Sequence, residues 1–172
     1  MIVVDNFLDE VTWNQFNDPA MWAEENSGDL AWLPVDAPVH NVMQVVAKRL
    51  WNFFDPHHVN NTGAIGYEYW YNILWRENGL KWHYDKDEKH WRDTGEIKIP
   101  IYGAVLYPSH EVDGGYLEIE NGRQEVERIA PVPNRAIFFS AGEDRHRVSP
   151  IRDGLRKTFA CNLWKEVPSE FS

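Results

Sequence analysis

The chain has 172 residues, a length that suits one domain with a hydrophobic core of its own. Hydrophobic residues make up 43% of it and charged residues 26%, which excludes the disordered and collagen-like classes. The net charge of −10 argues against a general nucleic-acid binder or a protein of anionic membrane surfaces, because both need clustered Lys and Arg. Nine tryptophans stand out in this composition and call for an explanation.

The N-terminal region has no features of export or membrane insertion. Residues 1–47 hold eight carboxylates and no Lys or Arg, whereas signal and transit peptides need basic residues. No apolar run approaches the ~20 residues of a membrane span. The single cysteine, Cys161, cannot form an internal disulfide and is expected to be a small buried hydrophobe. We therefore expect a cytoplasmic protein that has no membrane partner.

The first third of the chain is predicted to be mainly helical. In chain order the patterns predict a strand at residues 1–4, a helix at 9–17, and a longer helix that ends at Asp55–Pro56, followed by two surface histidines, His57 and His58. Asp36 is the expected cap of the longer helix, with Pro38 in its first turn. Apolar residues recur along this helix at helical spacing, so it is expected to cover another layer.

From residue 62 onward, period-two alternation replaces helical spacing, first along Ile65–Trp75. Further strands are expected at residues 80–84, 97–107, 116–120, 123–129, 135–139, 145–151 and 155–164. Asn121-Gly122 and Asp153-Gly154 are predicted hairpin turns, because these residue types tolerate positive φ. About eight short strands with such turns favour a jelly roll over a parallel α/β sheet.

The expected fold class is α+β and mainly β. It is a double-stranded β-helix of the jelly-roll or cupin-like type, with N-terminal helices packed on one sheet. We expect a single domain over residues 1–172, with a helical cover at 1–61 and a β-barrel core at 62–165.

Three residues can form a metal site. His83 and Asp85 are two positions apart in a predicted strand, so both side chains project from the same face. His146 follows 63 residues later in another predicted strand and can supply a third ligand. Two histidines and one carboxylate are the facial triad of non-haem Fe(II) oxygenases, which leaves positions open on the metal.

Arg156 follows His146 by ten residues, on a strand that returns after Asp153-Gly154. A guanidinium inside a barrel needs a partner, because an unpaired buried charge is costly. The distal carboxylate of a dicarboxylate cosubstrate would supply one through a bidentate contact. Thr158 lies two residues further on the same face and can donate its hydroxyl to that carboxylate.

Together these residues resemble the His-x-Asp…His-x10-Arg signature of the Fe(II)- and 2-oxoglutarate-dependent dioxygenases, and within them the prolyl 4-hydroxylase-like branch. Similar segments extend over most of the chain: Val3–Leu8, Ala104–Tyr107, Gly114–Leu117, Phe138–Phe139 and Val148-x-Pro150. The complete signature, in this order and spacing, is specific, whereas its parts alone are not.

The resemblance implies a site and a reaction. His83, Asp85 and His146 would hold Fe(II). The cosubstrate 2-oxoglutarate would chelate the metal at one end, and Arg156 and Thr158 would bind the other end. Reaction with O2 would give succinate and CO2 and hydroxylate an unactivated C–H bond, and ascorbate is expected to stimulate it. Because a carboxylate ligand is present, an iron halogenase of the same superfamily is disfavoured.

Two features depart from the pattern of that branch. A tryptophan commonly follows the arginine by six residues, but Asn162 stands there and Trp164 comes two residues later. The tyrosine that often contacts the cosubstrate is not evident from spacing, and Tyr71 and Tyr102 are the candidates.

Several aromatic residues flank the predicted metal site. Trp75, Trp82 and Trp91 are expected to form an apolar wall for the substrate. Residues 86–96 are expected to form a charged, flexible active-site loop with a solvated start at Asp87 and Glu88. The expected substrate is a peptidyl proline, another amino-acid side chain or a small molecule, and the oligomeric state is left open.

Two other interpretations remain at this point. One is a non-catalytic jelly-roll module that binds a metal and a peptide or sugar, although such a module has no need of Arg156. The other is a hydrolase that uses Zn²⁺ on the same triad, because imidazole and carboxylate ligands also suit zinc.

Overall fold

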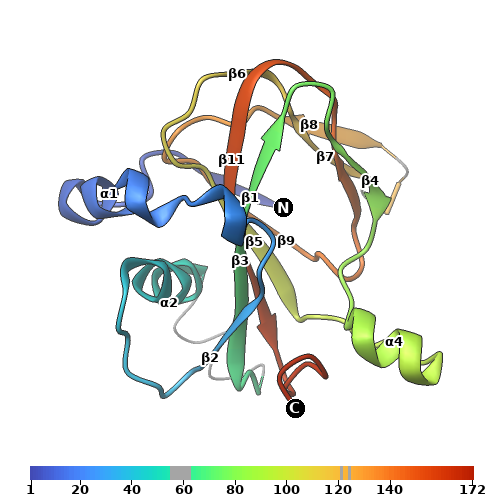
Figure 1. Cartoon of the computed structure of the whole chain (residues 1–172). Helices are drawn as coiled ribbons and strands as arrows, with labels where there is room; N and C mark the ends of the chain where they lie inside the picture. The colour runs from blue at the N-terminus through green and yellow to red at the C-terminus, as the bar shows by residue number, and fades with distance from the viewer. Residues whose placement is uncertain (55–62, 121, 124) are drawn as a thin grey trace.

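The computed structural model describes residues 1–54, 63–120, 122–123 and 125–172. Two antiparallel sheets form the body of the protein (Figure 1). The large sheet has the order β1 (Ile2–Val4), β9 (Ala136–Phe139), β5 (Tyr102–Leu106), β11 (Ile151–Trp164), β3 (Gly66–Trp75) and β2 (Ala31–Pro34), and β6 (Val112–Gly114) also pairs with β11. The small sheet has the order β4 (Leu80–His83), β10 (Arg145–Val148), β7 (Leu117–Glu120) and β8 (Val126–Ile129). The expected α+β, mainly β, jelly-roll class is confirmed.

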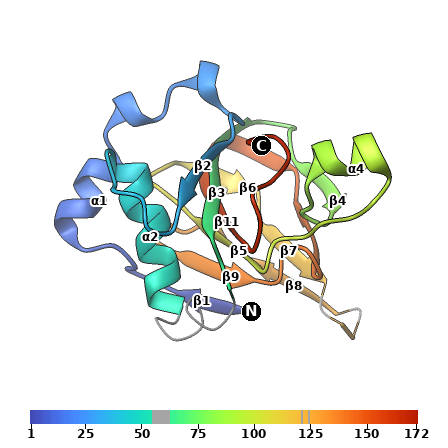
Figure 2. The same cartoon turned by 90° about the horizontal axis from the view of Figure 1, so that it is seen from below.

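Helices cover the outer face of the large sheet. They are α1 (Glu10–Phe16), α2 (Val42–Phe54) and the short 3-10 turns Pro19–Met21 and Glu24–Asn26. In Figures 1 and 2, α1 and α2 lie on one side of the large sheet and the small sheet lies on the other. The buried face of α2 contributes Met43, Val46, Leu50 and Trp51 to the core between helix and sheet. No helix within the described residues is long and apolar enough to span a membrane.

Strand periodicity separates two cores. On β11, Phe159, Cys161 and Leu163 face the helices. The alternate side chains, from Arg156 through Thr158 to Asn162, line a cavity that faces the small sheet. Because successive side chains of a strand point to opposite faces, a shift of one residue would exchange these two sets. The inner face of β11 therefore carries Arg156, Thr158 and Asn162, and its outer face carries the apolar Phe159, Cys161 and Leu163.

The start of one helix and the presence of another differ from the expectation. Asp36 does not cap α2, which begins at Val42, where Asn41 Oδ1 accepts a hydrogen bond from the Gln44 N–H at 3.0 Å. Pro38 disfavours helical backbone at Ala37, which would be the first helical residue after an Asp36 cap. The expected flexible loop at residues 86–96 instead contains the helix α4 (Glu88–Thr94).

Helix α4 has well-formed ends that the sequence analysis missed. Asp87 is its N-cap and accepts from the His90 N–H at 2.8 Å, and Gly95 ends it in a left-handed conformation with φ 77°. Asp87 is buried rather than solvated, because it also accepts from the Ser169 N–H at 2.6 Å near the C-terminus. This residue thus fixes α4 to the C-terminal segment.

One predicted turn is wrong. Asp153-Gly154 lies inside β11 and pairs with β6, so it does not join β10 to β11, which belong to different sheets. Gly154 has φ 81°, and a Cβ there would lie 2.2 Å from the Glu111 carbonyl oxygen, so glycine is required for a close backbone approach rather than for a hairpin.

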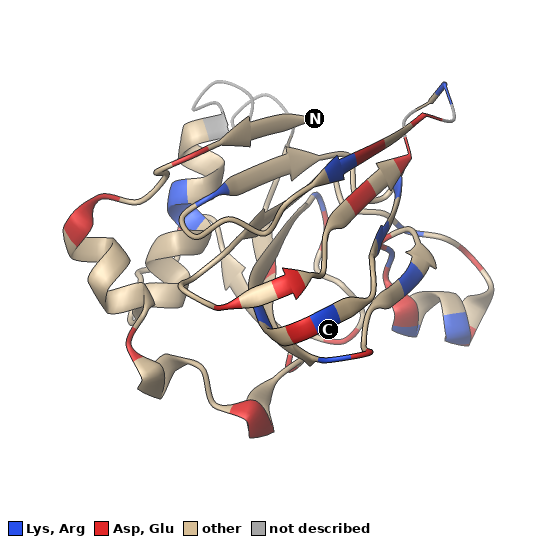
Figure 3. Ribbon diagram, turned by 90° about the horizontal axis from the view of Figure 1, so that it is seen from above, with Lys and Arg blue, Asp and Glu red and all other residues tan. Residues whose placement is uncertain are grey.

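The remaining differences concern the first third of the chain and a few positions outside the described residues. The expected helical cover also contributes β2, which pairs with β3 at the edge of the large sheet. The predicted β7–β8 hairpin is present as an antiparallel pair, but Asn121 of its turn lies outside the described residues. Asp55–Pro56, His57 and His58 lie outside them as well. Carboxylates are spread along many elements of the ribbon (Figure 3).

Candidate active site

Two histidines meet across the small sheet. His83 ends β4 and His146 lies on β10, and the two are register partners in the antiparallel ladder. Their ring centroids are 4.2 Å apart. The Nδ1 atom of His83 lies 2.7 Å from the Lys81 carbonyl oxygen, and Nδ1 of His146 lies 2.9 Å from that of Asp144. A carbonyl only accepts, so each Nδ1 carries the proton and each Nε2 is free to bind a metal.

Asp85 completes the triad just beyond the end of β4. Its N–H donates to the Ala141 carbonyl oxygen at 2.8 Å, which holds the backbone against the loop before β10. Its Oδ1 lies 3.6 Å from His83 Nε2 and 3.4 Å from His146 Nε2. The ligand atoms of the three residues all lie within 4.8 Å of one another. The structure thus brings together the three predicted metal ligands.

The three side chains influence one another's protonation. Burial favours a higher pKa for Asp85, but hydrogen bonding and charge interaction with His146 outweigh it and lower that pKa. Burial opposes charge on His146, yet the carboxylate of Asp85 raises its pKa. Burial and the neighbouring His146 lower the pKa of His83. A metal dication would be held by these groups in their deprotonated forms, so its binding would compete with protonation of Asp85 and His146.

Asn162 supports the carboxylate ligand. Its Nδ2 donates to Asp85 Oδ2 at 3.0 Å, which leaves Oδ1 directed at the two imidazoles. Asn162 occupies the position at which the branch commonly has tryptophan, so the departure noted in the sequence has a structural role here. Its same-face spacing from Arg156 and Thr158 was the signal that could have identified it.

Arg156 lies inside the barrel, only 2% exposed. Its Nε donates to the Gly115 carbonyl oxygen at 2.8 Å, one terminal nitrogen donates to Thr158 Oγ1, and the other donates to Tyr107 Oη at 3.2 Å. All three acceptors are neutral. Arg156 and Thr158 line the same inter-sheet cavity as His83, Asp85 and His146. A buried guanidinium beside a metal-ligand set is therefore available to pair with an anion in that cavity.

Tyr107 is a site residue that the sequence analysis missed. It is fully buried, and burial raises the pKa of its phenol although Arg156 opposes this. The two tyrosines that we expected at the cosubstrate lie elsewhere. Tyr71 packs in the helix-side core and its hydroxyl donates to the Ala23 carbonyl oxygen at 2.7 Å, and Tyr102 packs in the same core. Strand periodicity places both on the outer face of the sheet and Tyr107 on the inner one.

The three tryptophans predicted to contact the substrate do not all lie in one place. Trp82 and Trp91 line a surface groove beside His83. Two arginines stack on Trp82, with Arg147 at 4.8 Å from its ring centroid, and Lys86 lies 4.5 Å from that of Trp91. Trp75 is at the far end of β3, paired with Leu155 and 47% exposed, so it lies outside this groove. Trp70 lines the cavity at the metal ligands instead.

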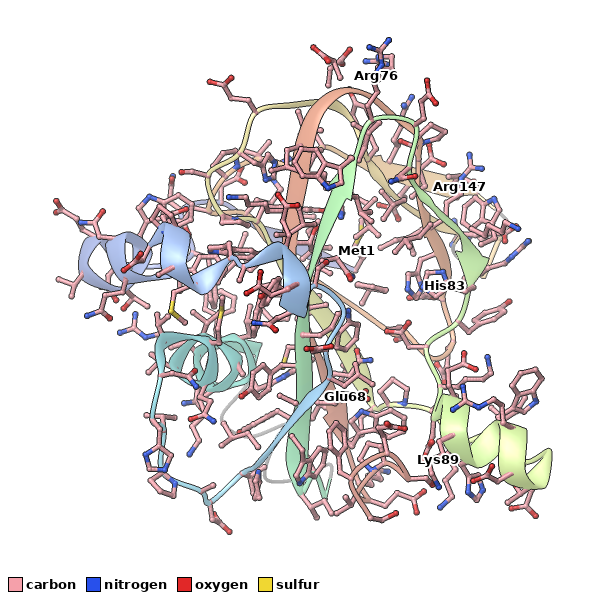
Figure 4. The ribbon with its side chains drawn as sticks, in the orientation of Figure 1. Met1, Glu68, Arg76, His83, Lys89 and Arg147 are labelled. Atoms are coloured by element: carbon pink, nitrogen blue, oxygen red, sulfur yellow. The ribbon has the colours of Figure 1, made fainter. Side chains whose placement is uncertain are left out.

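A wider cavity of about 390 Å³ opens from the triad toward α4 and the C-terminal segment. His83 and Asp85 form part of its wall, with Glu68 and Trp70 from β3. Charged residues of α4 line its rim, and Figure 4 shows Lys89 there and His83 on β4. The cavity therefore borders two of the three predicted metal ligands.

The donor set fits a divalent iron ion. Two imidazole nitrogens and one carboxylate oxygen converge, both imidazoles are anchored through their second nitrogen, and the remaining side of the cluster borders cavities. This is the ligand set of the non-haem Fe(II) oxygenases, and His83, Asp85 and His146 would hold the ion.

Comparison with known proteins identifies the family. The family model described as "2OG-Fe(II) oxygenase superfamily" matches residues 69–165, more than half of the chain. This segment contains the triad and Arg156. No match was found among curated proteins.

Solved structures share the fold at low sequence identity. A prolyl-4-hydroxylase of Pseudomonas putida superposes with a TM-score of 0.71 at 16% identity, over 96% of this chain and 88% of that one. A Trichoplax adhaerens prolyl hydroxylase, solved with a hypoxia inducible factor peptide fragment, gives 0.64 at 15% identity over 99% and 86%. The collagen prolyl hydroxylase of Paramecium Bursaria Chlorella virus-1, in its 2OG complex, gives 0.64 at 15% identity over 94% and 93%.

These comparisons agree with the geometry of the site. The family implies Fe(II), 2-oxoglutarate and O2 as cofactor and cosubstrates, and the described residues include a ligand set for the metal. The expected likeness to prolyl 4-hydroxylases is confirmed by the shared fold. The chain belongs to the 2OG-Fe(II) oxygenase superfamily and has a prolyl 4-hydroxylase-like fold.

Proposed function

We propose that this protein is an Fe(II)- and 2-oxoglutarate-dependent dioxygenase that hydroxylates an unactivated C–H bond of an amino-acid side chain, free or within a peptide. The observation that carries the proposal is the placement of three metal-ligand side chains and one buried guanidinium around a single cavity. The bound metal and cosubstrate supply the oxidation, in which one atom of O2 enters the substrate hydroxyl and the other enters succinate, with CO2 released.

The residues of the chain bind and orient the reactants. Arg156 and Thr158 provide donors for the distal carboxylate of 2-oxoglutarate, and Tyr107 adds a phenolic hydroxyl beside them. Asn162 holds Asp85 in position for the metal. Because the guanidinium is already ordered by three hydrogen bonds, little conformational entropy is lost when the cosubstrate binds.

Apolar residues of both sheets keep bulk water out of the inter-sheet cavity. Those that line it include Leu80, Val105, Leu117, Phe139 and Val148. Phe139 packs edge-on against His146, with ring centroids 4.9 Å apart. An apolar wall strengthens the pairing of Arg156 with a carboxylate and protects the oxidation from side reactions.

The buried arginine also favours an enzyme over a metal-binding jelly-roll module. Within the described part of the chain, Arg156 donates only to neutral acceptors, so its charge is uncompensated until an anion enters. In a module that only binds a metal and a peptide, the charge of Arg156 would stay buried without an anion to compensate it, which destabilises the fold. A peptide substrate is supported by the Trichoplax prolyl hydroxylase, a similar fold that was solved with a peptide fragment.

An anaerobic titration tests the proposal. We expect 2-oxoglutarate to bind the protein in the presence of Mn(II), and Arg156→Ala to weaken this binding by about 100-fold or more, since two charge-assisted hydrogen bonds of about 1.5–3 kcal/mol each are lost. Under O2 with Fe(II) and ascorbate, we expect slow succinate release without substrate, stimulated by ascorbate. Lack of 2-oxoglutarate binding under anaerobic conditions would refute the proposed function.

A further inference from the structure

Glu68 is a buried carboxylate that the proposed reaction does not use. It lies on the inner face of β3, is 8% exposed, and lines the wider cavity together with His83 and Asp85. Figure 4 labels it on β3, with His83 at the end of β4. Its register partner on β11 is Asn162, whose side chain donates to Asp85. One side chain therefore separates Glu68 from the carboxylate ligand of the metal site.

The known contacts of Glu68 do not explain its charge. Trp164 Nε1 donates to Glu68 Oε2 at 3.0 Å, a bond that a neutral amide oxygen would accept equally well. Within the described part of the chain, no Lys, Arg or His forms an ion pair with it or lowers its pKa. Burial, with the nearby Asp85 adding to it, raises the pKa of Glu68 to about 7 against hydrogen bonds from the neutral side chains of Trp164 and Asn162. A glutamine at this position would accept the same hydrogen bond without the free-energy cost of burying a charge, yet the chain has a glutamate there.

The other charges of the site do not require Glu68 either. The charges of Fe(II), Asp85, Arg156 and doubly ionised 2-oxoglutarate cancel, so the reaction centre is neutral without a further carboxylate. Three cations line this cavity near α4: Lys86, which pairs with Glu88 at 2.6 Å, Lys89, which pairs with Asp93 at 3.1 Å, and Arg92. Lys89 and Arg92 lie on α4 and Lys86 precedes it, and none of the three forms an ion pair with Glu68 among the described residues.

We propose that Glu68 binds a cationic nitrogen of the substrate, an ammonium or guanidinium group, and so selects a basic amino acid or a basic side chain of a peptide. A cation at Glu68 would compensate the buried charge and would lie in the cavity that His83 and Asp85 also line. This inference rests on the proposed function and adds the class of substrate to it.

Binding measurements with defined probes test this proposal. The protein is loaded with Mn(II) and 2-oxoglutarate without O2, and calorimetry follows the binding of L-lysine, L-arginine and their Nα-acetyl N-methylamides. The capped forms of norleucine and citrulline serve as neutral counterparts. Capped probes represent a residue within a peptide, so a preference for free or capped cations identifies the source of the basic group. Stimulated succinate release under O2 with Fe(II) provides an independent readout.

The test variants separate charge from structure. Glu68→Gln keeps an acceptor for Trp164, and we expect it to weaken binding of the cationic probes at least tenfold while it changes binding of the neutral ones less than twofold. Glu68→Asp retains the charge and should recover part of the loss. The matched control is Glu170→Gln, at an exposed carboxylate on the rim of the same cavity, which should have little effect.

Two results would overturn the proposal. One is that no cationic probe binds the loaded wild-type protein, and the other is that Glu68→Gln leaves their binding unchanged. Affinity for 2-oxoglutarate is measured on the same samples and depends on Arg156 rather than Glu68. If the cosubstrate binds and the cations do not, only this inference fails, whereas loss of cosubstrate binding refutes the proposed function itself.

Discussion

Tyr107 provides the sharpest test of how the cosubstrate end of the cavity is built. Its hydroxyl accepts a hydrogen bond from Arg156 at 3.2 Å, and burial raises its pKa, so the phenol stays protonated at neutral pH. An accepting hydroxyl still has its own hydrogen to donate. We expect this hydrogen to reach the distal carboxylate of 2-oxoglutarate beside the guanidinium.

The change Tyr107→Phe removes one hydrogen bond to a charged group and keeps the ring. Such a bond contributes about 1.5–3 kcal/mol, which corresponds to roughly 10- to 150-fold weaker binding of 2-oxoglutarate. The loss should be smaller than that of Arg156→Ala, because Arg156 retains the Gly115 carbonyl and Thr158 as partners. Anaerobic calorimetry with Mn(II) measures the affinity directly, and the KM for 2-oxoglutarate in succinate formation provides a second measurement.

Tyr71→Phe and Tyr102→Phe are matched controls, because both tyrosines pack on the helix side of the same sheet. Each removes one phenolic oxygen without reaching the inner cavity, so we expect affinities within about twofold of wild type. The reasoning fails if Tyr107→Phe binds the cosubstrate as wild type does, or if either control weakens binding as much as Tyr107→Phe.

Three further predictions concern the supporting residues. Asn162→Ala should lower metal affinity by about 10- to 100-fold, because Asn162 orients the metal ligand Asp85. Titration with Mn(II) measures this affinity. An unchanged affinity would show that other contacts hold Asp85. Glu68, with its pKa raised to about 7 from 4.5, binds more protons in the folded than in the unfolded metal-free protein between these values. Protonated Glu68 therefore adds up to about 3 kcal/mol to the free energy of unfolding. This stabilisation is fully present below pH 4.5 and is lost as pH rises through 7. Urea unfolding between pH 5 and 8 should show that the free energy of unfolding falls with pH in the wild type and falls less in Glu68→Gln. Equal pH dependence in the two proteins would contradict this prediction. The thiol of Cys161 is buried against Trp51, and burial raises its pKa, so a thiol reagent should modify it only after unfolding; rapid labelling of the native protein would contradict this placement.

Much of the site follows from local spacing. His83 and Asp85 share a strand-like segment, and Arg156 and Thr158 share another, so period-two alternation alone places each pair on one face. The same alternation identifies Cys161 as a buried residue of the opposite face. Because these relations lie within single elements, no tertiary information is needed for them.

The sequence could not show which face of each strand points inward. Tyr71, Tyr102 and Tyr107 are equivalent candidates by residue type, and only the packing of α1 and α2 on the large sheet assigns the first two to the outer core. Similarly, Asp153-Gly154 has the composition of a hairpin turn, but the pairing of β11 with β6 uses its glycine for a close approach. These outcomes depend on contacts between segments distant in the chain.

The sequence by itself determined the ligand set, the family resemblance and the jelly-roll class, because residue chemistry and strand periodicity are local properties. The tertiary structure alone decided that Asn162 donates to Asp85, that Tyr107 accepts from the buried Arg156, and that Glu68 lines the same cavity as His83 and Asp85 without an ion pair among the described residues. Each of these three depends on the register between strands and on the packing of two sheets, which neither composition nor spacing contains.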